Sequence, residues 1–202
     1  MRVGLFGGSF DPVHNGHIGP VLEAAQAAAL ERVIYLPTAQ PPHKPDRSFA
    51  PPLLRYAMVE LALLPHEHLR ASSYEMLTAP PTYTLDSMRH FQECHPDWQL
   101  HLVLGADCFD ALHTYHRWQE ILEAVSLVVM ERSGGPATSR ATDSRPAIRA
   151  SIEAGRVTFV ENSAVAASSS ELRRILGAGE EPPEGWLPKA VLELLLKYRP
   201  YR

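Results

Sequence analysis

The first 37 residues constrain the fold most, because two strand patterns flank a helical pattern there. The run RVGLF ends at a glycine pair, and IGPVLEAAQAAALE, which follows HNGH, is alanine-rich with helical spacing. RVIYLP, residues 32–37, then has the pattern of a second buried strand. A strand, a tight turn, a helix and a second strand make a βαβ unit, whose crossover is right-handed. These residues therefore predict a parallel sheet.

The alternation of strand and helix patterns continues along the chain. Further β-branched runs occupy residues 99–105, 125–130 and 156–161, and helical patterns occupy residues 83–95 and 117–125. An amphipathic helix is expected near the end, over LPKAVLELLLKY, with Pro188 near its first turn. This order of elements predicts an α/β fold with a doubly wound parallel sheet.

Two stretches interrupt the pattern and are predicted to be loops. Residues 37–52 are rich in proline, and residues 132–146 carry Gly, Ser, Thr and Pro with little apolar content. We expect most of the second stretch to be a surface excursion. The chain has no internal repeat.

Composition narrows the class of protein. The chain has 202 residues, of which 45% are hydrophobic and 21% charged, as expected for a globular protein with one good core. Its formal net charge of -4 gives no general attraction to nucleic acids or to anionic membranes, so an anionic ligand would need a local site.

Cellular location is predicted from cysteine usage and from the absence of long apolar runs. Cys94 and Cys108 form neither a CxxC pair nor a zinc spacing, and no leader pattern precedes the first strand. No apolar run approaches the roughly 20 residues of a membrane-spanning helix. We therefore expect a soluble, cytoplasmic protein with no membrane partner.

The stretch GLFGGSFDPVHNGHI lies at the first strand-to-helix turn. In an open α/β sheet, ligands bind outside the carboxyl ends of the strands, where a phosphate can meet backbone N–H groups and a helix N-terminus. Gly7 and Gly8 would allow positive φ and close approach of a ligand, and Asn15 could cap the helix. His14 and His17 are three residues apart, so both imidazoles can donate hydrogen bonds to one phosphate. The stretch predicts a phosphate-binding turn.

Other interpretations of this turn stay open. It matches neither GxxxxGK[ST] nor GxGxxG, which disfavours the common kinase-like and dinucleotide-binding loops. Taken singly, the glycines and proline fit an ordinary turn, and the two histidines fit a solvated helix end or a metal-binding pair. No third metal ligand with convincing spacing lies nearby, which weakens the metal-binding interpretation.

A second anion-binding candidate is SSSELRR, residues 168–174. Serines at a helix start offer hydroxyl and N–H groups, and Arg173 lies about one turn further on, where it can grip a phosphate. A capped surface helix is the alternative.

Together, these two motifs resemble signatures of the nucleotidyltransferase superfamily. GGSFDPVHNGH is similar to its HxGH signature, and SSSELRR is similar to its Ile-Ser-Ser-Thr-x-Ile-Arg signature, with Ala167, Ser170 and Leu172 as departures. The order of PPHK, PPTYTLDSM, GADCF, Trp118 with Ile121, and a closing LP...Y...Y most resembles the bacterial nicotinate mononucleotide adenylyltransferases. Pro80, Thr82 and Cys108 depart from that family's pattern. The resemblance implies one Rossmann-like nucleotidyltransferase domain over residues 1–202, with a small C-terminal helical portion over about 168–202.

The resemblance also implies roles for individual residues. It implies that His14, His17 and Arg173 are catalytic. The residues expected to bind ATP are Gly7, Gly8, Ser9, Phe10, His14, His17, Gly105, Asp107, Ser168, Ser169 and Arg173. Those expected to bind the second substrate are Lys44, Tyr83, Thr84, Trp118 and Arg132. Without the resemblance, Trp118 would fit a core position, Lys44 and Arg132 would fit the surface, and Asp107 would fit a helix cap.

The reaction implied is adenylyl transfer from ATP to nicotinate mononucleotide, giving deamido-NAD and pyrophosphate. Mg²⁺ is expected on the triphosphate, held mostly by phosphate oxygens and water, and no protein residue is named as a metal ligand. Alternatives are transfer to nicotinamide mononucleotide or phosphopantetheine, a non-catalytic nucleotide-binding regulator, and a metal-binding module. The expected partners are small molecules, and the oligomeric state is left open.

Overall fold

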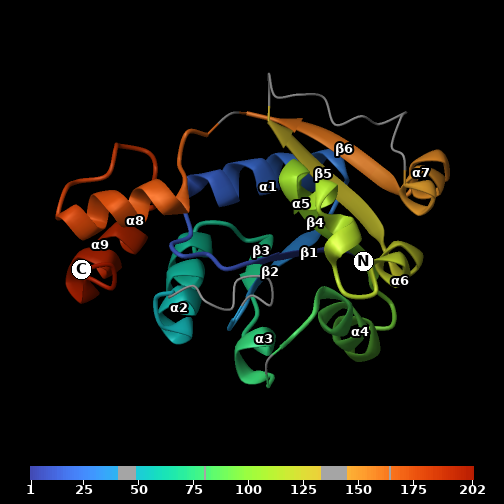
Figure 1. Ribbon diagram of the computed structural model, residues 1–202, viewed down its shortest axis with the longest axis horizontal. Helices are drawn as coiled ribbons and strands as arrows, with labels where there is room; N and C mark the ends of the chain where they lie inside the picture. The colour runs from blue at the N-terminus through green and yellow to red at the C-terminus, as the bar shows by residue number, and fades with distance from the viewer. Residues whose placement is uncertain (41–48, 80, 133–144, 164) are drawn as a thin grey trace. The chain divides into compact units, whose positions relative to one another are not determined.

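The computed structural model describes residues 1–40, 49–79, 81–132, 145–163 and 165–202 (Figure 1). The strands in these ranges are β1 (Arg2–Gly8), β2 (Arg32–Pro37), β3 (Leu69–Ala71), β4 (Gln99–Gly105), β5 (Ser126–Arg132) and β6 (Val157–Asn162). The α-helices are α1 (Asn15–Ala27), α2 (Pro52–Leu63), α3 (Tyr74–Leu77), α4 (Thr84–Cys94), α5 (Ala106–Asp110), α6 (Trp118–Ala124), α7 (Pro146–Glu153), α8 (Ser169–Ala178) and α9 (Lys189–Tyr198). A 3₁₀ turn, η1, spans Leu112–Thr114.

The strands are ordered β3-β2-β1-β4-β5-β6, which is the order typical of Rossmann folds. Strand β1 pairs in parallel with β4, β4 with β5, and β5 with β6. The chain order of the strands reverses direction between β1 and β4, so this is the switch point where such sheets bind ligands. The predicted α/β fold with a Rossmann-like parallel sheet is confirmed.

Local sequence explains most of these strands. The runs predicted over residues 32–37 and 99–105 are β2 and β4 with the same bounds, and their central residues are buried. Such continuous apolar runs are typical of strands covered on both faces. Strands β5 and β6 begin one residue later than predicted and end one or two residues later.

The chain divides into two compact units, each with its own apolar core. The first unit comprises residues 1–7, 20–33 and 83–163, and the second comprises residues 8–19, 34–82 and 164–202. Buried core side chains of the first unit include Val3, Leu102, Ile121 and Val128. Those of the second unit include Tyr35, Met58, Leu172 and Val191. The single domain expected from the sequence stays a prediction.

The two predicted loops lie largely outside the described residues, which omit 41–48 and 133–144. At their edges, Pro37 and Arg132 end strands, whereas Pro52 and Pro146 begin helices. Among the residues that the structure describes, none of the helices is long and apolar enough to cross a membrane.

Candidate functional site

The turn after β1 is shaped by Phe10 rather than by glycine conformation. Gly7 and Gly8 belong to the end of β1, and neither is among the residues with positive φ, so that expectation was wrong. The left-handed residue is Phe10, with φ of 46° and a ring only 2% exposed. A Cβ at Gly8 would lie 3.0 Å from this ring, so Gly8 makes room for it. A non-glycine residue in this conformation is a strained feature of a kind that clusters at functional sites.

His14 and His17 are brought together as predicted. Their ring centroids are 3.8 Å apart with an interplanar angle of 33°. The backbone N–H of His14 donates to Nδ1 of His17 at 3.2 Å. Nδ1 of His17 is therefore an acceptor, and a neutral His17 ring carries its proton on Nε2.

The surroundings of His17 favour that neutral state. Burial, and next the neighbouring His14, lower the pKa of His17 well below its usual value. The Phe10 ring contacts the His17 ring edge-on at 5.3 Å between centroids, and the Tyr35 hydroxyl donates to the His17 carbonyl at 2.7 Å. His17 is thus a fixed, neutral hydrogen-bond donor.

Backbone N–H groups at the start of α1 were expected to be available to a phosphate, but two of them already donate to protein carbonyls. Asn15 is the first helical residue, and its side-chain amide donates to the Gly185 carbonyl at 2.7 Å, so its predicted capping role was wrong. The backbone N–H of Asn15 donates to the Trp186 carbonyl at 2.9 Å, and that of His17 to the His14 carbonyl at 2.8 Å. Side chains, more than these amides, are therefore the groups that could meet a phosphate.

The serine-rich motif begins helix α8 and is bonded to the turn after β1. Ser168 caps the helix, with its Oγ accepting from the Glu171 N–H at 3.2 Å, as the capped-helix alternative predicted. Ser169 Oγ donates to the Pro12 carbonyl at 3.0 Å. Arg173 Nη1 donates to the Asp11 carbonyl at 2.6 Å, and its side chain is 21% exposed. The two motifs, about 155 residues apart in sequence, are thus joined within the second unit.

Arg55 was not predicted from the sequence, and its side chain donates a hydrogen bond to the same turn. It is 0% exposed, and burial lowers its pKa, an effect that the nearby Asp11 carboxylate opposes. Its guanidinium donates to the carbonyls of Ser9 (2.6 Å), Thr38 (2.8 Å), Ala39 (2.8 Å) and Ala50 (3.0 Å). A lone arginine in the apolar stretch LLRYAMVELAL was the available signal, because a buried cation needs such partners.

In the first unit, the candidate residues lie at strand and helix ends. Gly105 ends β4 and precedes α5, and Asp107 is exposed in the first turn of that helix. Tyr83 precedes α4, and its N–H donates to Asp86 Oδ2 at 3.3 Å, so Asp86 is a competitor for any carboxylate bound there. Arg132 is the exposed last residue of β5.

Tyr83 contacts His116, which lies two residues before Trp118. The Tyr83 ring stacks on His116, with centroids 4.4 Å apart and an interplanar angle of 30°. Trp118, half-buried, is the first residue of α6. Arg89 of α4 and Glu120 of α6 form an ion pair at 2.9 Å, which joins the two helices. Lys44 lies outside the described residues.

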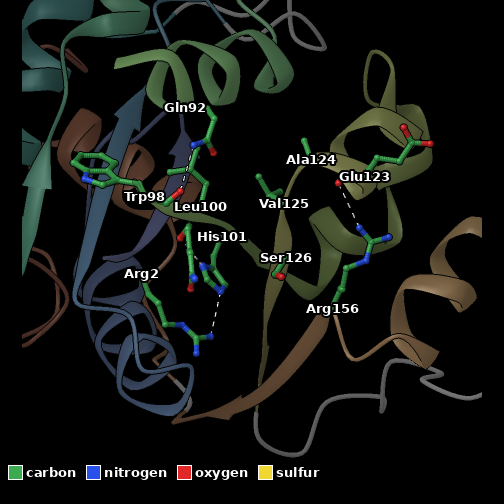
Figure 2. A pocket seen from close by; sticks show the side chains of 11 residues that line it. Arg2, Gln92, Trp98, Leu100, His101, Glu123, Ala124, Val125, Ser126 and Arg156 are labelled. Carbon is green, nitrogen blue, oxygen red and sulfur yellow. Dashed lines mark hydrogen bonds between the residues drawn. The ribbon is translucent and has the colours of Figure 1, made fainter. Parts of the chain in front are cut away.

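The cavity drawn in Figure 2, of about 460 Å³, belongs to the first unit. It lies at the amino ends of the strands, whereas Gly105 and Arg132 lie at the carboxyl ends. Arg2, Gln99 and Ser126, the first residues of β1, β4 and β5, line it. Its basic groups have protein partners: Arg2 contacts His101 at 3.2 Å, and Arg156 donates to the Glu123 carbonyl at 3.4 Å (Figure 2). It lies at the amino ends of the strands, so we do not assign it to the reaction.

The described ranges contain no group of three or more His, Cys, Asp or Glu side chains that could hold a metal ion. Asp11, the buried carboxylate of the first motif, lies 3.8 Å from the Arg173 guanidinium, which disfavours a cation there.

Comparison with known proteins identifies relatives over nearly the whole chain. The cytidylyltransferase-like family model matches residues 5–175. A Pseudomonas paraeruginosa protein named "Probable nicotinate-nucleotide adenylyltransferase" is 35% identical over 217 aligned positions, covering 100% of this chain and 97% of that protein. A Symbiobacterium thermophilum protein of the same name is 33% identical, covering 99% of this chain and 95% of that protein.

Solved structures share the fold. Plasmodium falciparum nicotinic acid mononucleotide adenylyltransferase complexed with NaAD superposes with a TM-score of 0.74 at 15% identity, covering 99% of this chain and 97% of that one. The same enzyme complexed with APC gives a TM-score of 0.75.

Proposed function

Because the chain belongs to the cytidylyltransferase-like family and, within it, to the nicotinate-nucleotide adenylyltransferases, we propose that it transfers the adenylyl group of ATP to nicotinate mononucleotide. The products are deamido-NAD and pyrophosphate, and the reaction is a step of NAD biosynthesis. ATP is a substrate of the reaction.

The bonding between the two motifs is the single observation that best supports this reaction. Ser169 and Arg173 of α8 bond to the carbonyls of Pro12 and Asp11, which precede His14 by two and three residues. These bonds therefore hold the two imidazoles and the guanidinium in one part of the second unit. Such a set of donors suits a polyphosphate, whose negative charge needs several donors at once.

We assign the contacts with the ATP phosphates and with the leaving pyrophosphate to the second unit. His14 and His17, with the backbone from Gly8 to Phe10, contact the ATP phosphates, and Gly7 precedes this backbone as part of β1. Ser168, Ser169 and Arg173 contact the pyrophosphate that leaves. Ser169 Oγ can accept a hydrogen bond while it donates to Pro12, since a hydroxyl does both.

We assign the remaining roles to the first unit. Gly105 and Asp107, at the carboxyl end of β4, contact the adenosine ribose. Trp118 stacks on the pyridine ring, as an aromatic ring can. The N–H groups of Tyr83 and Thr84, at the start of α4, receive the nicotinate carboxylate, which at Tyr83 takes the place of Asp86 Oδ2. Arg132 of this unit binds the phosphate of the mononucleotide, and we assign the same role to Lys44, which belongs to the second unit and lies outside the described residues.

The chemical step forms one P–O bond and breaks another. An oxygen of the mononucleotide phosphate attacks the α-phosphorus of ATP, and the bond from this phosphorus to the oxygen bridging to the β-phosphate breaks. The protein forms no covalent bond to either substrate. Its residues hold the groups in line and neutralise the charge that spreads over the oxygens and the leaving pyrophosphate. His17 donates through Nε2–H, and Arg173 provides a positive charge.

Mg²⁺ enters as part of the Mg·ATP substrate. We assign the ion to phosphate oxygens and water rather than to a protein cage, because Mg²⁺ dehydrates reluctantly and is commonly held by substrate phosphates. No catalytic step of the residues above depends on a protein–metal bond.

The acceptor is tested by incubating the purified protein with Mg·ATP and either nicotinate or nicotinamide mononucleotide, and following pyrophosphate release. We expect rapid release with nicotinate mononucleotide and at least tenfold slower release with the nicotinamide form, because N–H donors favour a carboxylate over a neutral amide. Equal rates would remove the carboxylate role of Tyr83 and Thr84. No release with either would overturn the proposed function.

Replacing Gly16, which sequence reasoning did not single out, is expected to slow the reaction without harming the fold. A Cβ at Gly16 would lie 2.9 Å from Cε1 and Nδ1 of His14, so the buried His14 ring must move. We expect Gly16→Ala to lower kcat/KM by about ten- to a hundredfold, as displaced catalytic donors do.

Gly19 is the matched control for Gly16, since it lies in the same helix and a Cβ there meets nothing within 4 Å. Gly19→Ala should keep the wild-type rate and raise stability by about 0.5–1 kcal/mol through helix propensity. Steady-state rates and thermal unfolding of both variants check this, and a wild-type rate for Gly16→Ala would show that the His14 ring position is unimportant.

A further inference from the structure

We propose that Tyr201 is a positioning residue for the reaction, which acts on Arg173 through the buried carboxylate of Asp11. The inference rests on the proposed function, in which Arg173 contacts the pyrophosphate part of ATP. It assigns a role to the C-terminal segment that follows α9, which neither motif includes.

The first link joins Tyr201 to Asp11. The Tyr201 hydroxyl donates to Asp11 Oδ1 at 3.0 Å, and the Ala50 N–H donates to the same oxygen at 3.1 Å. Asp11 is only 1% exposed, so water contributes little to its solvation. A buried carboxylate depends on its donors, and these two fix the direction in which its other oxygen faces.

The second link joins Asp11 to Arg173. Arg173 Nη1 lies 2.6 Å from the Asp11 carbonyl oxygen and 3.8 Å from Asp11 Oδ2. Nη2 of the same guanidinium donates to Ser170 Oγ at 3.1 Å. Ser170 and Asp11 thus both constrain the plane of the guanidinium. The Asp11 carboxylate acts on it by charge at 3.8 Å, so we expect a change in the direction of this carboxylate to alter where Arg173 directs its charge.

The third link is backbone packing of the C-terminal segment against α8 (Figure 1). A Cβ at Gly177 of α8 would lie 2.9 Å from the Tyr201 carbonyl oxygen, so Gly177 lets this segment approach the helix that carries Arg173. Burial, and next the charge of Asp11, raise the pKa of Tyr201, which keeps its hydroxyl protonated and able to donate. Tyr201 therefore contacts Asp11 through its hydroxyl and lies against α8 through its backbone carbonyl.

The test is Tyr201→Phe, which removes only the hydroxyl, with Tyr198→Phe as the matched control. Tyr198 is the last residue of α9, and it is 58% exposed. We expect Tyr201→Phe to lower kcat/KM for Mg·ATP about tenfold, the size expected for a hydrogen bond to a charged group, with KM for nicotinate mononucleotide unchanged. Tyr198→Phe should keep wild-type constants. A wild-type rate for Tyr201→Phe would overturn the inference.

A double-mutant cycle separates positioning from loss of stability. If Tyr201 acts through Arg173, Tyr201→Phe should cause no further loss in an Arg173→Ala background, because the group it positions is gone. Equal losses in both backgrounds would overturn the inference.

Gly177→Ala, which displaces Tyr201 without touching the hydroxyl, should reproduce the selective loss for Mg·ATP. A uniform loss for both substrates would contradict the inference.

Mg·ATP binding, measured by titration calorimetry without acceptor, separates this inference from the proposed function. A wild-type protein that binds Mg·ATP but transfers to neither mononucleotide would remove the proposed acceptor, and weaker binding by Tyr201→Phe would still support the positioning role. A wild-type protein that binds no Mg·ATP would overturn both.

Discussion

Replacing His17 by alanine is expected to lower the rate of pyrophosphate release by about 10²–10³-fold, as when one donor to a developing charge is removed. Its Nδ1 accepts from the His14 N–H, so the neutral ring presents its proton at Nε2. A donor fixed before the reaction needs no reorganisation as charge builds on the phosphate oxygens. We therefore expect kcat to fall much more than the affinity for Mg·ATP.

The fold should survive His17→Ala. The Tyr35 hydroxyl bonds to the His17 carbonyl, which alanine retains, whereas the bond from the His14 N–H to Nδ1 is lost. One such bond contributes about 1 kcal/mol, which corresponds to about 2–4 °C in Tm for a chain of this size.

His68→Ala is the control for His17→Ala, because His68 is an exposed histidine of the second unit. It should leave both the rate and Tm at the wild-type values. Rapid-quench rates and thermal unfolding of the two variants decide the matter. Wild-type turnover in His17→Ala would remove His17 from the mechanism, whereas a collapse of Tm would show that the ring is needed for the fold.

Sequence patterns predicted the strands well where a long apolar run is bounded by Pro or Gly. The runs that form β2 and β4 satisfy this condition, and their bounds agree with the prediction. β3 was missed because Leu69–Ala71 is three residues long, too short to display a period. Helix α2 was also missed, since Pro52–Leu63 is apolar almost throughout and has little contrast between its faces.

The candidate site was predicted where its parts are close in sequence and missed where tertiary contacts make it. His14 and His17 are neighbours on a helix, so spacing alone placed their rings together. Arg55 and Tyr201 contact the same turn from positions about 46 and 190 residues away. No local pattern encodes such contacts. The left-handed Phe10 was likewise invisible, because the glycines before it offered a simpler explanation of the turn.

Replacing Arg173 by alanine is expected to lower kcat/KM for Mg·ATP by about 10²–10³-fold, because the leaving pyrophosphate loses a fixed positive charge. Binding of nicotinate mononucleotide should stay at the wild-type value, since its proposed contacts are other residues. Arg173→Lys should recover part of the loss, because lysine keeps the charge but not the planar fork that the Asp11 carbonyl and Ser170 Oγ hold.

The adjacent Arg174 is the matched control for Arg173. Its side chain is 60% exposed and pairs with Glu171 at 2.8 Å, so it shares the helix and the charge of Arg173 but not its bond to Asp11. Exposed pairs of this kind contribute little, and Arg174→Ala should keep the wild-type rate. If both variants lost activity equally, the general positive charge of α8 would be responsible rather than the oriented guanidinium. If Arg173→Ala weakened only mononucleotide binding, the two substrates would be assigned to the wrong residues, because Arg173 would then bind the acceptor phosphate.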